Sequence, residues 1–215
     1  VTRVRADPSR YAALVDEVAA AHAGRTSRWL VRPHPGHERL TEALAAAGYA
    51  PADRAVATSI ATSSAASTAA GGPAVRAVAT LRDLDDWWDV IEGAFERSAD
   101  RTDPERRLRE CTEPCARVHR FVAYDETTGA PVSAGGVTLF PALQFCLLWA
   151  GSTIREARGR GAYSAVLTAR LAWAREAGIE RAGLFALVDT SAPIVARYGF
   201  DAHETVTYWE RGSTR

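Results

Sequence analysis

The chain has 215 residues, of which 26 are acidic and 26 basic, so its formal net charge is zero. It lacks the basic excess typical of nucleic-acid and membrane-surface binding, and its 47% apolar fraction excludes global disorder. Every basic residue is Arg, Ala is abundant, and Lys, Asn and Met are absent, a bias that indicates a GC-rich bacterial genome.

The N-terminal segment has the pattern of two helices and two strands. An Ala-rich helix is predicted over 11–23 and a strand over 29–32. A second helix follows over 36–47, ended by Gly48-Tyr49, and 56–60 has the composition of a strand. Residues 1–57 therefore predict a small α/β segment.

An uncharged stretch of Ser, Thr, Ala and Gly follows over 58–73. This composition is typical of a flexible linker. The sequence therefore predicts three parts: a segment over 1–57, a linker over 58–73 and a domain over 74–215.

The larger part begins with a short strand over 74–79. Thr80 caps a helix whose apolar face includes Trp87 and Trp88, of which one is expected in the core and the other near a pocket. Asp103-Pro104 begins a second helix. Two strands, 121–124 and 132–140, are joined by a hairpin turn at 126–129.

The last third of the chain alternates strands and helices. Residues 143–150 are apolar on both faces, which indicates a central strand. A helix over 162–177, a buried strand over 182–188, a short helix between Ser191 and Gly199, and a final strand over 205–209 follow. The order resembles that of 1–57; an internal repeat or two similar Ala-rich compositions would each explain it.

The chain has three cysteines, Cys111, Cys115 and Cys146, and no His or Cys set with zinc-ligand spacing. An odd count favours a reducing compartment, and neither a metal site nor a disulfide framework is predicted. No membrane span or signal peptide is recognisable, so the cytoplasm is the expected location.

The segment that indicates chemistry is Ser152-Thr-Ile-Arg-Glu-Ala-Arg-Gly-Arg-Gly-Ala-Tyr163, where a buried strand leads into an Arg/Gly turn and a helix. Free backbone N–H groups and the helix dipole make such a helix start suitable for anions. Gly159 and Gly161 allow a ligand to approach the backbone closely. A pyrophosphate fits this pattern; an ordinary turn with solvated arginines is the alternative.

These residues resemble the acetyl-CoA signature of the GNAT acetyltransferase superfamily. Arg158 and Gly161 match the signature, whereas Tyr163 stands where a small residue is usual. The downstream SAPIVARYGF and the order of elements over about 74–211 extend the resemblance. It implies an α/β (α+β) GNAT fold, a central mixed twisted sheet with helices on both faces and a V-shaped splay between its two central parallel strands.

The resemblance also implies a site for acetyl-CoA as co-substrate, with no metal. Backbone groups of the residues that end the central strand would pair with the pantetheine arm, and amides of the turn would hold the pyrophosphate. The implied cofactor-binding residues are Ser152, Thr153, Ile154, Arg155, Arg158, Gly159, Arg160, Gly161, Ala162, Tyr163 and Ser191.

The acid and base are less well indicated. Many members of the superfamily carry a Tyr where this chain has Val195, so Tyr198 is the nearby candidate acid. Glu156 and Asp189 are candidate bases, since Asp189 follows a buried strand and Glu156 precedes the turn. Packing, helix capping and plain solvation are the competing interpretations of these three side chains.

The resemblance implies an acetyl-CoA-dependent N-acetyltransferase that transfers an acetyl or other acyl group directly to an amine of a small molecule or protein. The alternative is a weak or inactive CoA-binding, regulatory module, because the usual Tyr is missing. No nucleic acid or membrane partner is expected. The segment 1–57 has no Arg/Gly turn, so it is expected to bind no CoA and to pack on the larger domain or on a second subunit of a homodimer.

Overall fold

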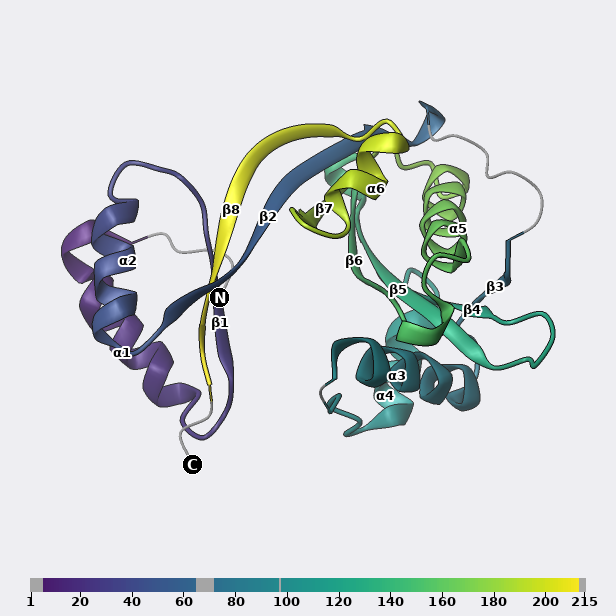
Figure 1. The fold of residues 1–215 in the computed structure, drawn as a ribbon, viewed down its shortest axis with the longest axis horizontal. Coiled ribbons are helices and arrows are strands. Elements are labelled where there is room, and N and C mark those ends of the chain that lie inside the picture. Colours follow the sequence, from purple (N-terminus) through teal and green to yellow (C-terminus); the bar gives the residue numbers. More distant parts are fainter. Residues whose placement is uncertain (1–5, 65–71, 97, 213–215) are drawn as a thin grey trace. The chain divides into compact units, whose positions relative to one another are not determined.

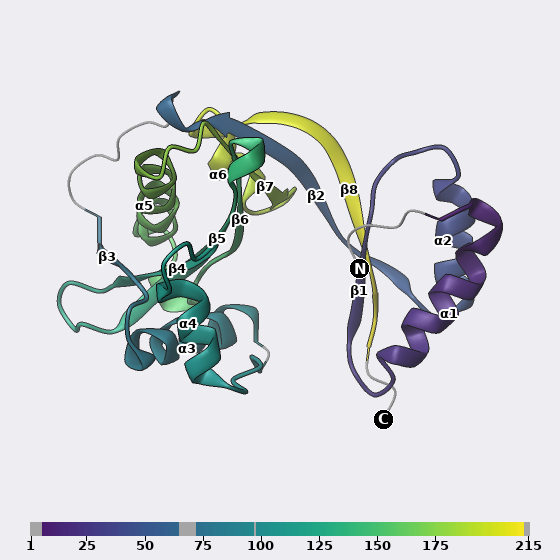
Figure 2. The ribbon, with the colours of Figure 1, turned by 180° about the vertical axis from the view of Figure 1, so that it is seen from behind.

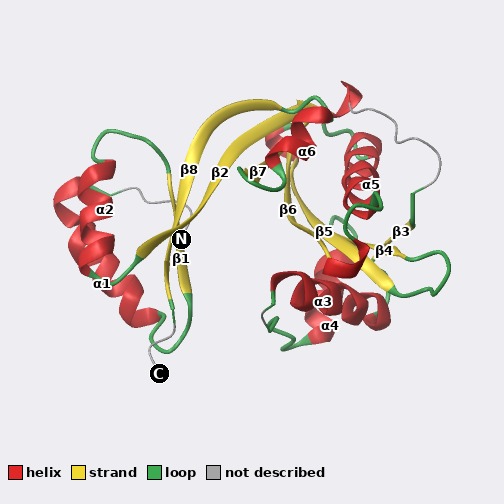
Figure 3. Ribbon diagram, viewed as in Figure 1, coloured by secondary structure: helices red, strands yellow, loops and turns green. Residues whose placement is uncertain are grey.

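The computed structural model describes residues 6–64, 72–96 and 98–212. Contacts divide the chain into a terminal unit, Val1–Thr58 with Phe185–Arg215, and a central unit, Ser59–Leu184. Eight strands are hydrogen-bonded into one mixed sheet in the order β1-β8-β2-β7-β6-β5-β4-β3, and the helices complete an α/β fold (Figures 1 and 3). The predicted fold class is confirmed.

The central unit contains most of the elements expected from 74 onward. They are β3 (Ala74–Ala77), α3 (Leu81–Phe95), α4 (Pro104–Thr112), β4 (Val118–Tyr124), β5 (Pro131–Phe140), β6 (Phe145–Thr153), α5 (Ala162–Glu176) and the larger part of β7 (Arg181–Leu187). β3 to β6 pair antiparallel in chain order, whereas β6 and β7 are parallel. In Figures 1 and 2, α3 and α4 lie on one side of β4–β6 and α5 on the other.

Local sequence signals explain where α3 and α4 begin. Thr80 Oγ1 accepts a hydrogen bond from the Asp83 amide at 3.2 Å, and Asp83 accepts one from the Thr80 amide at 2.9 Å, which completes a capping box. Asp103 caps α4 through the Arg106 amide at 3.2 Å, with Pro104 as the first helical residue. Each cap contributes about 1 kcal/mol to helix stability.

The apolar face of α3 forms the core of the central unit with β4 and β5. Leu84, Trp87, Trp88 and Val122 are all buried there. Both tryptophans lie in this core, whereas only one was expected there, and the place of the other near a pocket remains a prediction. Trp87 is in edge contact with Trp149, and the Arg101 guanidinium lies 5.7 Å from the Trp88 ring centre, so both adjacent residues have packing partners.

The terminal unit contains two helices and the strands at the other end of the sheet. Its elements are α1 (Tyr11–Ala21), β1 (Ser27–Val31), α2 (His37–Ala46), most of β2 (Ala50–Ala61), the end of β7, α6 (Ala192–Arg197) and β8 (Asp201–Arg211). α1 and α2 lie side by side over β1 and β8 (Figures 1 and 2), and their core includes Val15, Trp29 and Leu44. β1 pairs antiparallel with β8 over Ser27–Val31 and Thr207–Arg211.

The element order agrees with an internal repeat, one of the two explanations that the sequence leaves open. Helix, strand, helix and strand follow one another both in α1-β1-α2-β2 and in α5-β7-α6-β8. By their contacts, residues 185–215 belong with the N-terminal segment and not with 74–184. The division of the chain at 57 and 73 remains a prediction from composition.

Strand bounds differ from the expected ones at two places. Residues 58–61 of the predicted linker belong to β2. The next residue, Thr62, donates a hydrogen bond from Oγ1 to the Ile179 carbonyl at 2.6 Å. Residues 65–71 of that linker lie outside the described residues. The central strand runs over Phe145–Thr153 rather than 143–150, because Pro141–Leu143 forms a 3-10 turn and Gln144 has a left-handed φ of 48°.

Candidate functional site

The parallel pairing of β6 with β7 covers only the first part of β6. In the carboxyl-terminal half of β6, this edge of the strand has no partner in the β6–β7 ladder. The parallel pairs are Phe145 with Arg181, Cys146 with Ala182 and Leu147 with Gly183, and β6 then continues to Thr153. On its other edge, β6 remains paired with β5 up to Thr153. A ligand could therefore add to this edge beyond Leu147 as a strand would. The carbonyls of Trp149, Ser152 and Thr153 already accept hydrogen bonds from side chains.

A β-bulge interrupts this half of β6. The register with β5 shifts between Ala134 and Gly136, which pair with Ser152 and Trp149 respectively, so Ala150 and Gly151 face one residue of β5. Ala150 has a φ of 50°, a left-handed conformation that costs a non-glycine residue about 1–2 kcal/mol. Bulges and strained backbone of this kind occur preferentially at functional sites. We call residues 134–136 and 149–152 the β5–β6 bulge.

The Arg/Gly turn connects β6 to α5. It contains one 3-10 turn, Arg155–Ala157, and two glycines with positive φ, 77° at Gly159 and 81° at Gly161. A Cβ built on either glycine has no neighbouring atom within 4 Å. Arg158 Nε donates to the Thr153 carbonyl at 3.2 Å, which ties the turn to the end of β6. The turn thus needs glycine for its backbone, and the space above these two residues is open.

The start of α5 is suited to an anion. Gly161 is its N-cap and supplies no side chain, and the first turn contains no acidic residue. The first N–H groups of a helix have no acceptor within the helix and carry partial positive charge. Exposed Arg158 and Arg160 precede them, and Arg155 is 76% exposed with a weak ion pair to Glu96 at 3.7 Å. This set of donors fits a pyrophosphate group.

Tyr163, the departure from the usual signature, leaves the turn intact. A Cβ on Gly151 would lie 3.0 Å from the Tyr163 ring, so the ring occupies space that the glycine leaves in β6. Helix α5 begins at Ala162 with the expected Gly161 conformation. The large side chain is therefore accommodated by a glycine on the neighbouring strand.

Ser152, Thr153 and Ile154 lie at the end of β6, as predicted. The Ser152 carbonyl accepts from Ser133 Oγ at 2.6 Å, and Thr153 Oγ1 lies 3.0 Å from the same hydroxyl. Ser152 Oγ is buried without a hydrogen-bond partner in the described part of the chain. A buried hydroxyl without a partner costs about 1–3 kcal/mol, which a bound polar ligand would offset.

The candidate acid and bases do not lie in one unit. Glu156 is exposed in the turn of the central unit, whereas Asp189 and Tyr198 belong to the terminal unit. Asp189 is exposed after β7, and Tyr198 is half-buried at the end of α6, close in sequence to the fully buried Val195. The roles of the three side chains remain predictions.

Ser191, also predicted to contact the cofactor, is the N-cap residue of α6. Its Oγ accepts from the Leu187 amide at 2.8 Å rather than from an amide of the helix. The hydroxyl thus stabilises the turn after β7, and its predicted cofactor contact remains a prediction.

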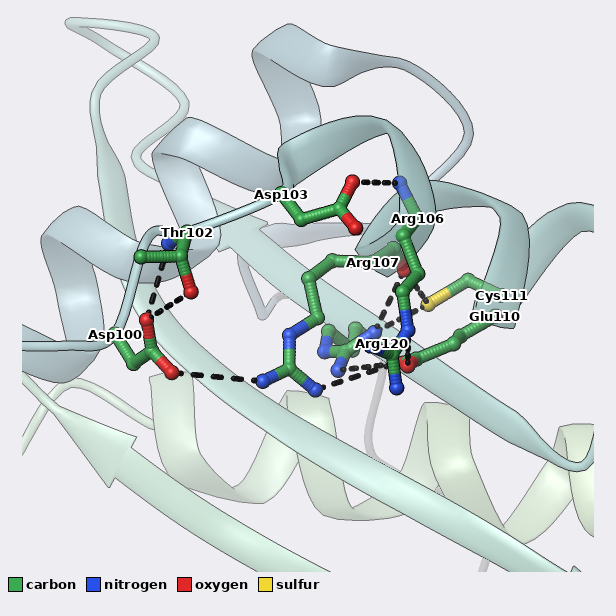
Figure 4. Close-up of polar contacts among 8 residues, drawn as sticks. All are labelled: Asp100, Thr102, Asp103, Arg106, Arg107, Glu110, Cys111 and Arg120. Atoms are coloured by element: carbon green, nitrogen blue, oxygen red, sulfur yellow. Dashed lines mark hydrogen bonds and ion pairs between the residues drawn. The ribbon is translucent and has the colours of Figure 1, made fainter.

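The arginines of α4 form ion pairs instead of an open cationic surface. Arg107 pairs with Asp100 at 3.7 Å and with Glu110 at 3.5 Å, and Glu110 also faces Arg120 at 3.6 Å (Figure 4). Arg120 is buried and donates to Cys111 Sγ as well. The network ties α4 to β4, so these arginines stabilise the packing of the helix on the strand.

Arg170 is the residue that the sequence did not indicate. It lies on α5, it is 1% exposed, and it donates from Nη1 to the carbonyls of Gly136 and Trp149 at 3.2 Å each. Both carbonyls belong to the β5–β6 bulge. The available signal was the set of glycines at 135, 136 and 151, because side chains there would collide with Arg170 or Trp149.

The described residues contain no group of three or more His, Cys, Asp or Glu side chains that could hold a metal ion. Within the same ranges, no helix is long and apolar enough to cross a membrane.

Comparison with known proteins identifies the fold. A GCN5-related N-acetyltransferase from Kribbella flavida is 15% identical, with a TM-score of 0.65, and the match covers 100% of this chain and 79% of that one. A putative GNAT acetyltransferase from Novosphingobium aromaticivorans is 16% identical (TM-score 0.60; 98% and 84% covered). A tandem GNAT protein from the clavulanic acid biosynthesis pathway is also 16% identical (TM-score 0.58; 96% and 70% covered).

No protein-family model and no curated protein matches the sequence. The solved structures nevertheless share the chain's fold over nearly its whole length. The chain therefore has the fold of the GNAT superfamily, as the motif in its sequence predicts.

Proposed function

We propose that this protein is an N-acetyltransferase that uses acetyl-CoA and transfers the acyl group directly to an amine. The observation that carries the proposal is the uncapped start of α5 behind Gly159 and Gly161, directly after the free edge of β6. An anion site next to a strand edge matches the two ends of the cofactor, a pyrophosphate and an amide-containing arm.

Each part of the site has a proposed role. The amides from Arg158 to Tyr163 bind the pyrophosphate, and Arg155 and Arg160 add positive charge. Backbone groups of Ser152 to Ile154 pair with the pantetheine arm, and an N–H in the β5–β6 bulge polarises the acyl carbonyl. The bound cofactor supplies an activated thioester, so that a C–N bond forms to the acceptor amine while the C–S bond breaks and the CoA thiolate leaves.

The amine must lose a proton in the same reaction. We propose Glu156 and Asp189 as the candidate bases, acting directly or through water. Tyr198 is the candidate acid, although a thiolate with an ordinary pKa near 8.5 can leave without one.

The acceptor is proposed to be an amine on a small molecule or on another protein, since this chain has no lysine side chain of its own to modify. A cytoplasmic bacterial enzyme without nucleic-acid or membrane partners is the setting that the composition favours. We further propose that residues 1–57 have a structural role and bind no CoA.

The test is thiol release from acetyl-CoA against a panel of small amines and lysine-containing peptides, with binding measured in parallel by calorimetry. Acceptor-dependent release supports the proposal. Tight acetyl-CoA binding with no turnover on any acceptor would refute it and favour a regulatory CoA-binding module. No binding at all would refute both.

A further inference from the structure

Arg170 is a buried cation whose position the fold has to accommodate. Its side chain reaches from α5 to the β5–β6 bulge, and Nε also donates to the Val166 carbonyl at 3.2 Å. None of the ion pairs found within the described ranges involves it. An arginine keeps its charge in proteins, so the desolvation of this guanidinium is offset by carbonyl dipoles rather than by a carboxylate.

Glycines on β5 and β6 leave space for this side chain. A Cβ on Gly135 would lie 2.7 Å from Arg170 Cζ, and one on Gly151 would lie 3.1 Å from Nη2. The contact at Gly135 is too short for a side chain unless the guanidinium moves, and the contact at Gly151 is tight. Two strands and one helix therefore combine to bury a positive charge at a single point of the sheet.

The buried charge of Arg170 lies at the β5–β6 bulge. The Trp149 carbonyl, which accepts from Nη1, immediately precedes Ala150 with its left-handed φ. The Gly136 carbonyl, the second acceptor, belongs to the strand on the other side of the register shift. Arg170 thus bonds both strands of the β5–β6 bulge, and its hydrogen bond to the Trp149 carbonyl polarises the peptide group that carries the Ala150 N–H.

We propose that Arg170 is a positioning residue for acyl transfer: it fixes the bulge of β6 and adds positive potential where the acyl oxygen binds. The inference rests on the proposed function, in which a bulge amide polarises that oxygen. A preorganised, partly desolvated charge strengthens such a hydrogen bond without reorganisation during the reaction. Arg170 acts from the α5 side through the backbone, and it need not touch the substrate.

The experiment compares Arg170→Met and Arg170→Lys with Arg175→Met, a control that removes an exposed arginine from the same helix. The first readout is kinetic, with acetyl-CoA and the best amine of the panel. Arg170→Met is expected to lower kcat about tenfold or more with KM for acetyl-CoA unchanged. Arg170→Lys should recover part of the loss, and Arg175→Met should match the wild type.

The second readout is independent of turnover. Acetonyl-CoA, an unreactive ketone analogue, is bound to each variant, and the infrared stretch of its carbonyl is recorded. Binding to the wild type should shift the band to lower wavenumber, and Arg170→Met should lose most of that shift at unchanged affinity. A full shift in Arg170→Met would overturn the inference and leave the proposed function standing, whereas a wild type that does not bind the analogue would overturn both.

A third readout needs no substitution, in case the variants do not fold. In wild-type protein labelled with 15N-arginine, acetonyl-CoA should shift the resonance of the buried Arg170 guanidinium, and acetone, which lacks the CoA part, should not. An unchanged Arg170 resonance on saturation with acetonyl-CoA would overturn the inference.

Discussion

Replacing Gly161 with alanine separates the strain of the turn from its role in binding. Gly161 and Gly178 are at the two ends of α5, with φ of 81° and 75°, and a Cβ on either meets nothing within 4 Å. Both substitutions should therefore lower the free energy of unfolding by the same amount, about 1–2 kcal/mol for an alanine in the left-handed conformation. Each should lower Tm by about 2–4 °C for every kcal/mol lost.

Only Gly161→Ala should weaken acetyl-CoA binding. Its methyl group occupies the open space in front of the helix start, and loss of one charge-assisted hydrogen bond there, worth about 1.5–3 kcal/mol, raises Kd about tenfold or more. Calorimetric titration of both variants and the wild type measures this. Equal affinities in Gly161→Ala and Gly178→Ala, at equal loss of stability, would show that the turn does not hold the pyrophosphate.

Three further outcomes follow from packing and burial. Deleting residues 1–57 removes the strand that pairs with β8, so residues 185–211 should lose amide protection and the protein should become insoluble; a stable, fully soluble product would contradict this. A thiol reagent at pH 7 should modify Cys115 alone in the folded chain and all three cysteines after unfolding, because Cys111 and Cys146 are buried. Burial raises the pKa of the Cys146 thiol from 9.0 to about 11, so the folded state keeps a proton that the unfolded state loses. Between pH 9 and 11 the free energy of unfolding of the wild type should therefore fall by about 2 kcal/mol because of this thiol. Cys146→Ala should lack this part of the decrease.

The sequence predicts local structure well where capping residues and glycines mark it. Thr80, Asp103 and Gly161 each begin the helix that their chemistry indicates, and the Arg/Gly turn follows the central strand as expected. These features depend on a few neighbouring residues, so a single sequence contains the information.

Long-range packing is harder to predict. The spacing of Leu167, Leu171 and Ala174 places them on one apolar face of α5, and all three are buried. Arg170, one turn after Leu167, would be assigned to solvent because charged residues are seldom fully buried. Its burial depends on carbonyls of two strands and on glycines at 135 and 151. Likewise, the pairing of β1 with β8 joins residues far apart in the chain, and no local pattern specifies it.

The most direct test of the central claim is a crystal structure of the chain with acetyl-CoA. We expect the pyrophosphate on the amides between Arg158 and Tyr163, and the thioester oxygen at an amide of the β5–β6 bulge near Ala150 and Gly151. A cofactor bound elsewhere, or with its thioester directed away from this bulge, would contradict the proposed function.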